Sequence, residues 1–140
     1  MIFVLDTSTE NTFMGLWYDK WLAENRFVGG RELNAKLFTE LDKTFRQSGE
    51  YKKVSEAIRQ VTGIVVASGP GSFTGLRIGL SVANTLAYSL DVPIVGIQDE
   101  TDPEKLLQKG LSVLKSRGAS FGEVVVPHYG AEPHITKPKG

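Results

Sequence analysis

One stretch, residues 73–90, constrains this chain more than any other, because it is long enough for about five helical turns and almost free of charge. Ser72 is a good N-cap, and no proline follows before Pro93. The only charged side chain in the stretch is Arg77, and apolar residues recur along two of its sides. An ordinary surface helix has one apolar stripe and one charged face. We therefore expect this helix to be buried on two sides, by its own sheet and by a second surface.

Two glycines of this helix, Gly75 and Gly79, lie four residues apart. Each costs about 0.5–1 kcal/mol relative to alanine, so each indicates that another backbone comes close. That backbone could belong to the chain's own strands or to a partner. We favour the partner, because a domain of 140 residues has limited surface with which to bury a helix all round.

Composition sets the outer bounds. The length predicts one domain, and the 16 basic and 16 acidic side chains cancel, which disfavours a direct nucleic-acid binder. The absence of cysteine excludes disulfides, thiolate metal sites and a cysteine nucleophile. Both histidines, His128 and His134, lie near the end, so the main body has no histidine base or metal ligand. No signal peptide or membrane span is indicated, and we expect a cytoplasmic protein.

The order of elements predicts an α/β fold, in which three antiparallel strands are followed by helix, strand, helix and strand. The strands are expected at residues 2–5, 12–18, 21–27, 64–67 and 94–97. The helices are expected at residues 32–47 and 73–90, with a short turn at 54–58. The last strand, helix and strand form a βαβ unit, whose two strands should be parallel.

Beyond Gln98 the sequence changes character. Asp102 and Pro103 begin a helix that is expected to reach about Lys115. Val124–Val126 is expected to form a short last strand, and residues 128–140 an extended tail.

Two polar segments are candidates for a phosphate site: the run after the first strand and the glycine-rich turn before the long helix. The residues concerned are Asp6, Thr7, Ser8, Gly69, Gly71 and Ser72. A P-loop would need a lysine after its glycines, and a dinucleotide fingerprint would need its third glycine one residue earlier. A structural turn is the favoured interpretation of the glycines, and the Asp6 run alone leaves a local hydrogen-bonded turn equally open. No catalytic residue and no metal site is assigned.

Three segments, at residues 1–10, 69–81 and 87–96, resemble the TsaB (YeaZ) family in order and spacing. The resemblance implies an actin-like (ASKHA, ribonuclease H-like) lobe with a mixed five-stranded sheet. It implies a non-catalytic scaffold that binds and activates a TsaD-like threonylcarbamoyl transferase, which with a TsaE-like ATPase forms N6-threonylcarbamoyladenosine in tRNA. ATP and metal are then expected in the partner complex rather than in this chain, and tRNA is met only through that complex.

The resemblance also implies that the two lobe helices form the contact with the transferase. When the chain is alone, we expect the same helices to pair two copies, because a large exposed apolar surface rarely stays in contact with water. The candidate partner-binding residues are Leu33, Leu37, Leu41, Leu76, Leu80, Ala83, Asn84 and Ala87. Which of them face outward is left open, since some must cover the sheet. The alternative from another class is a small actin-like ATPase or phosphotransferase that uses Asp6 and the Gly69–Gly75 turn.

Two departures from the family are visible. Members usually carry a histidine near the start of the first helix, where this chain has Leu33 and Asn34. They also have a much longer second lobe. We expect residues 1–98 to form the N-terminal lobe and residues 99–140 to be a remnant of the second, left by an internal deletion, because residues 127–129 and 135–139 resemble the family's closing segment.

Overall fold

A mixed five-stranded sheet forms the centre of the computed structural model, which describes residues 1–49, 51–117 and 123–129. The strands are β1 (Ile2–Asp6), β2 (Asn11–Tyr18), β3 (Lys20–Val28), β4 (Gly63–Gly69) and β5 (Ile94–Gln98). Their order across the sheet is β3-β2-β1-β4-β5. The first three are antiparallel neighbours, whereas β4 runs parallel to both β1 and β5. The predicted meander and βαβ unit are thus confirmed.

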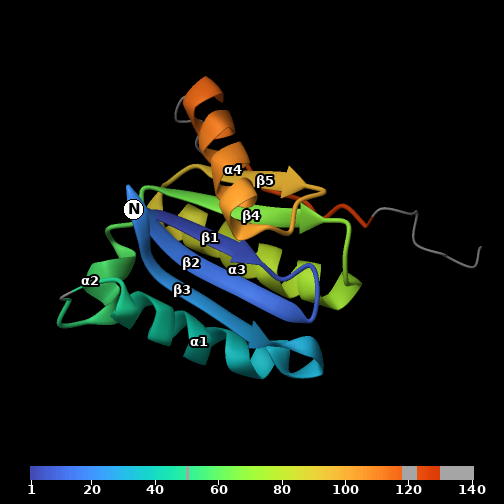
Figure 1. The fold of residues 1–140 in the computed structure, drawn as a ribbon, viewed down its shortest axis with the longest axis horizontal. Coiled ribbons are helices and arrows are strands. Elements are labelled where there is room, and N and C mark those ends of the chain that lie inside the picture. Colours follow the sequence, from blue (N-terminus) through green and yellow to red (C-terminus); the bar gives the residue numbers. More distant parts are fainter. Residues whose placement is uncertain (50, 118–122, 130–140) are drawn as a thin grey trace, which may run out of the picture.

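Helices cover both faces of this sheet (Figure 1). They are α1 (Leu33–Gln47), which follows a short 3-10 turn η1 (Gly30–Glu32), α2 (Val54–Ile58), α3 (Phe73–Leu90) and α4 (Pro103–Arg117). The helices α1 and α3 pack on one face and α4 on the other. None of the helices in the described ranges combines the length and the hydropathy that crossing a membrane requires.

The alternation of side chains along β1 explains why both faces need cover. Phe3 and Leu5 belong to the core cluster shared with α1 and α3, and the ring of Phe3 stacks on that of Phe45 at 5.7 Å between centroids. Val4, between them, belongs to the cluster on the opposite face. A strand that is apolar from Ile2 to Leu5 is thereby buried on both sides.

The second face is closed by α4. Its Leu106 and Leu107 are fully buried, and they pack with Val65 and Val95 of the parallel strands. The helix predicted from Asp102 and Pro103 is confirmed, and it shares a core with the sheet. That residues 99–140 are a remnant of a second lobe stays a prediction.

Residues Val124–Val126 do not form the strand that was predicted. A strand needs a neighbouring strand to receive its backbone hydrogen bonds. The backbone of Val125 is instead bonded to the side chain of Asn84 in α3. The segment Glu123–Tyr129 is therefore extended but lies outside the sheet. The tail predicted beyond Tyr129 falls outside the described residues.

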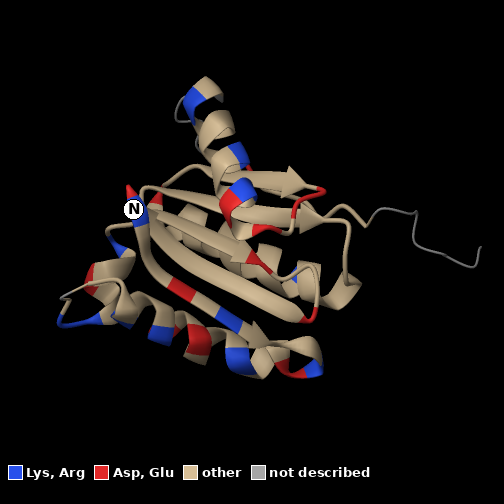
Figure 2. Cartoon of the chain, in the orientation of Figure 1, with Lys and Arg blue, Asp and Glu red and all other residues tan. Residues whose placement is uncertain are grey.

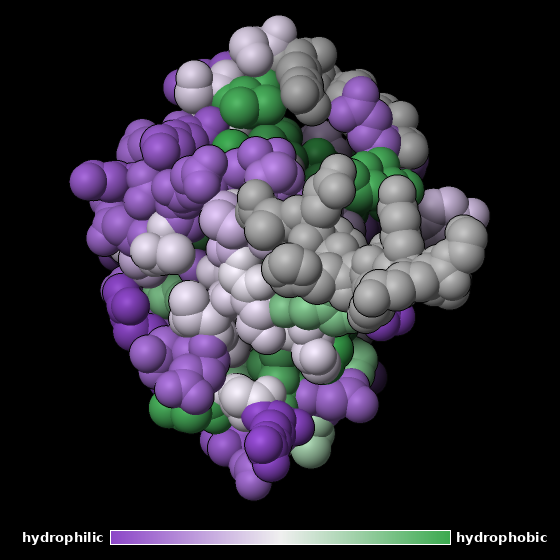
Figure 3. All heavy atoms as spheres, turned by 90° about the vertical axis from the view of Figure 1, so that its right-hand side faces the viewer, coloured by the Kyte–Doolittle hydropathy of each residue, from purple (hydrophilic) through white to green (hydrophobic). Residues whose placement is uncertain are grey.

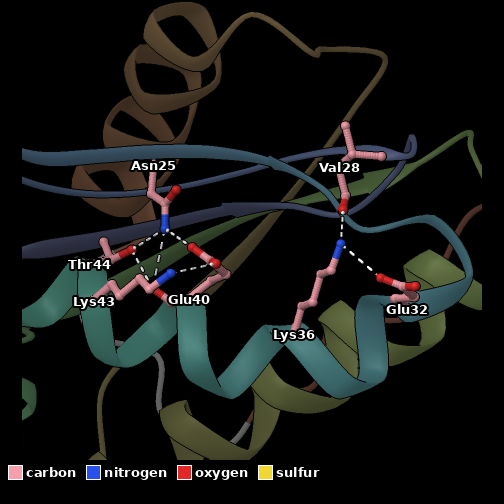
Figure 4. A network of polar contacts seen from close by, with 7 residues as sticks. All are labelled: Asn25, Val28, Glu32, Lys36, Glu40, Lys43 and Thr44. Atoms are coloured by element: carbon pink, nitrogen blue, oxygen red, sulfur yellow. Dashed lines mark hydrogen bonds and ion pairs between the residues drawn. The ribbon is translucent and has the colours of Figure 1, made fainter.

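A polar network ties α1 to β3 (Figure 4). Asn25 Nδ2 donates to Glu40 Oε2 at 2.8 Å and to Thr44 Oγ1 at 3.2 Å. Lys36 Nζ donates to the carbonyl oxygen of Val28 at 3.2 Å, and it forms an ion pair of 2.9 Å with Glu32. These bonds fix one side of α1 against the edge strand.

Candidate partner-binding surface

The carboxylate of Asp6, at the end of β1, is bound by the chain itself. Its Oδ1 accepts from the backbone nitrogen of Ser8 at 2.8 Å and from the Ser8 hydroxyl at 2.6 Å. Burial raises the pKa of Asp6, and the two bonds from Ser8 oppose that rise. The geometry is that of a local hydrogen-bonded turn, one of the two interpretations that the sequence left open.

The glycine-rich turn lies directly against this loop. The backbone nitrogen of Ser72 donates to the carbonyl oxygen of Ser8 at 2.8 Å, and Ser72 Oγ accepts from Gly75 N at 3.3 Å, which confirms Ser72 as the N-cap. A Cβ on Gly71 would overlap that same Ser8 carbonyl oxygen and lie 2.8 Å from Ser8 Cβ. The six candidate phosphate residues lie in two segments that contact one another, and the polar atoms just named bind protein atoms.

This end of the molecule is shown in Figure 3, which looks onto the side of the sheet where β1, β4 and β5 end. Hydrophilic and neutral residues make up most of the surface that is not grey, and apolar residues appear in separate patches. Over the part of the chain that the structure describes, no group of three or more His, Asp or Glu residues could hold a metal ion.

The glycines of α3 are explained by the chain's own loop. A Cβ on Gly79 would lie 2.7 Å from Thr7 Cγ2 and 2.9 Å from Thr7 Cβ, and one on Gly75 would overlap the Thr7 carbonyl oxygen. Thr7 Oγ1 also donates to the carbonyl oxygen of Gly75 at 2.7 Å. The sequence-based inference that these glycines admit a partner's backbone is therefore wrong, because the β1–β2 loop already lies against them.

The structure places most of the candidate partner-binding residues inside the chain. Seven side chains are buried, and all of them except Leu76 belong to the core cluster that α1 and α3 share with the sheet: Leu33, Leu37, Leu41, Leu76, Leu80, Ala83 and Ala87. The eighth, Asn84, is partly exposed and binds Val125. These positions mainly cover the sheet, and of the eight only Leu80 and Asn84 also line the outward face of the two helices.

That outward face forms an open groove of about 770 Å³ between α1, α3 and the segment Glu123–Tyr129. From α1 it is lined by Asn34 and Phe38, and from α3 mainly by Thr74, Arg77, Ile78, Ser81 and Val82. Phe38 is 64% exposed, and Ile78 and Val82 are half-buried. Sequence reasoning did not select these residues for the interface. The signal was the second apolar row of α3, which includes Ile78 and Val82.

The groove is almost uncharged. Among the described residues that line it, Arg77 is the one that carries a charge. Figure 2 shows the same contrast along the ribbons, with charges on α1, α2, α4, β3 and the loops while α3 is almost entirely neutral. Neutral surface with an exposed phenylalanine is typical of a protein-binding site rather than a nucleic-acid-binding site.

Comparisons with known proteins give the relationship. The chain is 39% identical over 75 residues to the tRNA threonylcarbamoyladenosine biosynthesis protein TsaB of Bacillus subtilis (strain 168), which covers 54% of this chain and 28% of that protein. It is 30% identical over 100 residues to the protein of the same name from Haemophilus influenzae, which covers 71% of this chain and 40% of that one. The chain is therefore similar to the TsaB (YeaZ) family. It spans less than half the length of these relatives.

Structure comparison gives the same family. YeaZ from Pseudomonas aeruginosa matches with a TM-score of 0.61 at 28% identity, over 70% of this chain and 43% of that one. The model of a neighbouring family, TsaD, tRNA N6-adenosine threonylcarbamoyltransferase, matches residues 42–99, which hold the glycine-rich turn, α3 and β5. The expected actin-like (ASKHA) fold class of the TsaB family is confirmed.

Proposed function

We propose that this chain acts in the formation of N6-threonylcarbamoyladenosine in tRNA, as a non-catalytic scaffold that binds and activates a TsaD-like transferase. Its relatives are named as biosynthesis proteins of that modification, and a TsaD model matches part of the chain. The chain would act within a cytoplasmic complex that also holds a TsaE-like ATPase, and it would meet tRNA only there.

One observation carries the proposal: the two lobe helices present an exposed, nearly uncharged groove on the side away from the sheet. A specific interface buries about 1,200–2,000 Å² in total, so the groove would be its centre and the neighbouring helix surface its rim. A scaffold of this kind stabilises the active conformation of its partner by binding free energy alone, and it transfers no proton.

No comparable observation among the described residues supports the ATPase alternative. It needs Asp6 and the glycine-rich turn to face a nucleotide, whereas the carboxylate and the turn are bonded to Ser8. We infer that the six candidate phosphate residues serve to hold the β1–β2 loop against the start of α3.

Co-elution with the TsaD-like transferase of the same organism tests the proposal. Phe38→Glu places a charge at the exposed centre of the groove and is expected to weaken binding at least about tenfold, as loss of an interface hot spot does. Tyr18→Glu is the matched control, because this aromatic residue at the end of β2 is 64% exposed, as Phe38 is, and does not line the groove. Both variants should keep the wild-type melting temperature. Co-elution of Phe38→Glu at wild-type strength, or failure of the wild-type chain to bind, refutes the proposal.

When the transferase is absent, we propose that the same groove pairs two copies of the chain, because exposed apolar surface favours self-association. Sedimentation velocity on the isolated chain should show a dimer that Phe38→Glu dissociates. A wild-type chain that stays monomeric at high concentration would contradict this part of the proposal.

A further inference from the structure

The extended segment Glu123–Tyr129 is held on α3 and at the end of β4 by specific contacts. Asn84 Nδ2 donates to the carbonyl oxygen of Val125 at 2.8 Å, and the backbone nitrogen of Val125 donates to Asn84 Oδ1 at 2.9 Å. Further along, the backbone nitrogen of His128 donates to the carbonyl oxygen of Ser68 at 2.7 Å. One side-chain amide thus bonds both polar groups of a single residue, as a neighbouring strand would.

Close packing adds to these bonds. A Cβ on Gly96 would overlap Val125 Cγ1, so the absence of a side chain in β5 makes room for this valine. At the other end of the segment, the ring of Tyr129 stacks on that of Phe73 with 4.6 Å between centroids. The segment is attached at Val125, His128 and Tyr129, although it belongs to no sheet.

Because the segment is extended, its side chains alternate in direction. Val125 points toward the body of the chain, whereas Val124 and Val126 are each 70% exposed. Both line the groove that also contains Phe38, Ile78 and Val82. The two hydrogen bonds between Asn84 and Val125 therefore hold the exposed Val124 and Val126 beside the surface of the helices.

The positive charge of Arg77 in the groove lies beside the same contacts. The guanidinium of Arg77 lies 5.4 Å from the centroid of the Phe73 ring, whose position is set by the stack with Tyr129. The ion pairs found within the described ranges do not include Arg77. A single cation among the otherwise uncharged described residues of the groove favours a ligand with an apolar surface and one carboxylate.

We propose that the segment Glu123–Tyr129 is a third wall of the docking groove, and that the transferase surface received there is apolar and carries one carboxylate facing Arg77. Asn84 is then a positioning residue, which acts by holding Val124 and Val126 in place. This inference rests on the proposed function, and it names a recognition chemistry that the two helices alone do not provide.

The charge is tested by calorimetric titration of the full chain with the transferase at low and high NaCl concentration. Arg77→Gln is expected to weaken binding about fivefold, as an ion pair at a partly exposed site does, and to flatten the dependence on salt. Arg46→Gln removes an exposed arginine of α1 that pairs with Asp42 away from the groove. This control should bind like the wild type at every salt concentration.

The wall is tested by Asn84→Ala, with the exposed neighbour Thr85→Ala as its control. In the free chain, hydrogen exchange at residues 123–129 should rise in Asn84→Ala while exchange in α1 and α3 stays unchanged. Binding should weaken about tenfold, because the two valines are no longer held in the groove. In the wild-type complex, the transferase should protect residues 123–129 as well as both helices.

The outcomes distinguish failure of the third wall and its carboxylate from failure of the proposed function. If the wild-type chain binds and all four variants bind equally well, the third wall and the carboxylate are wrong while the proposed function stands. Protection confined to α1 and α3 likewise overturns the wall. If the wild-type chain does not bind the transferase, the proposed function fails and this inference fails with it.

Discussion

Replacing Gly79 by alanine tests whether the glycines of α3 serve the chain's own packing. The added Cβ would lie 2.7 Å from Thr7 Cγ2 and 2.9 Å from Thr7 Cβ, whereas ordinary van der Waals contact begins at 3.4 Å. Thr7 is 1% exposed and bonded to Gly75, so it cannot turn away freely. Overpacking of this kind costs about 2–3 kcal/mol, and alanine returns about 1 kcal/mol of helix propensity. We expect a net loss of about 1–2 kcal/mol in the free energy of unfolding.

Urea denaturation followed by circular dichroism measures this loss. Ser81→Ala, on the exposed side of the same helix, is the control and should change stability by less than about 0.5 kcal/mol. Thr7→Ala removes the Oγ1 and Cγ2 atoms that would meet the new methyl group, so the double variant should be less destabilised than the sum of the two single variants. If Gly79→Ala were as stable as the wild type, or gained the helix propensity, the glycine would not be needed for the loop, and a partner's backbone would again explain it.

Three further predictions concern other parts of the chain. Burial raises the pKa of Asp6 in the folded chain, so ionisation of Asp6 destabilises the fold increasingly as pH rises from the unfolded pKa through the raised value. Asp6→Asn, whose Oδ1 can still accept from Ser8, should therefore become more stable relative to the wild type between pH 4 and pH 7. A stability difference that is constant over this pH range would contradict the prediction. Leu106→Ala in α4 should cost about 2–5 kcal/mol by chemical denaturation, against almost nothing for the exposed Lys105→Ala, and a small loss would mean that α4 is not part of the core. Ser72→Ala should cost about 1 kcal/mol through the lost N-cap, measured in the same way, and full stability would show that the 3.3 Å bond to Gly75 contributes nothing.

The strands and helices of residues 1–117 could be predicted from the sequence, because local signals agree with the tertiary structure. Ser72 caps α3 as its position suggests, and Asp19, with φ of 60°, makes the tight connection between β2 and β3. The run Val124–Val126 misled for a physical reason. Its β-branched residues fit an extended backbone, but whether a strand lies beside them is a property of the whole fold.

The candidate interface could be predicted only as far as its two helices. The sequence of a helix with two apolar rows does not reveal which row covers the sheet. In the structure, the row with Leu76 and Leu80 is the one that is buried. The glycines gave a misleading signal, because close approach by the chain's own loop and by a partner leave the same mark in the sequence. The hydrogen bonds between Asn84 and Val125 join residues 41 positions apart, and no local sequence pattern encodes such a pairing.

The layer beneath α4 has a practical consequence for spectroscopy. Both tryptophans of the chain, Trp17 and Trp21, pack against the cluster on that side of the sheet, and Trp21 Nε1 donates to Glu104 Oε2 of α4 at 2.9 Å. The groove lies on the opposite side of the same sheet. The intrinsic tryptophan fluorescence of this protein should therefore change when α4 detaches from the sheet and stay constant when a partner binds in the groove. A change in the emission of Trp17 or Trp21 on adding the transferase would mean that binding had altered the structure on the α4 side of the sheet.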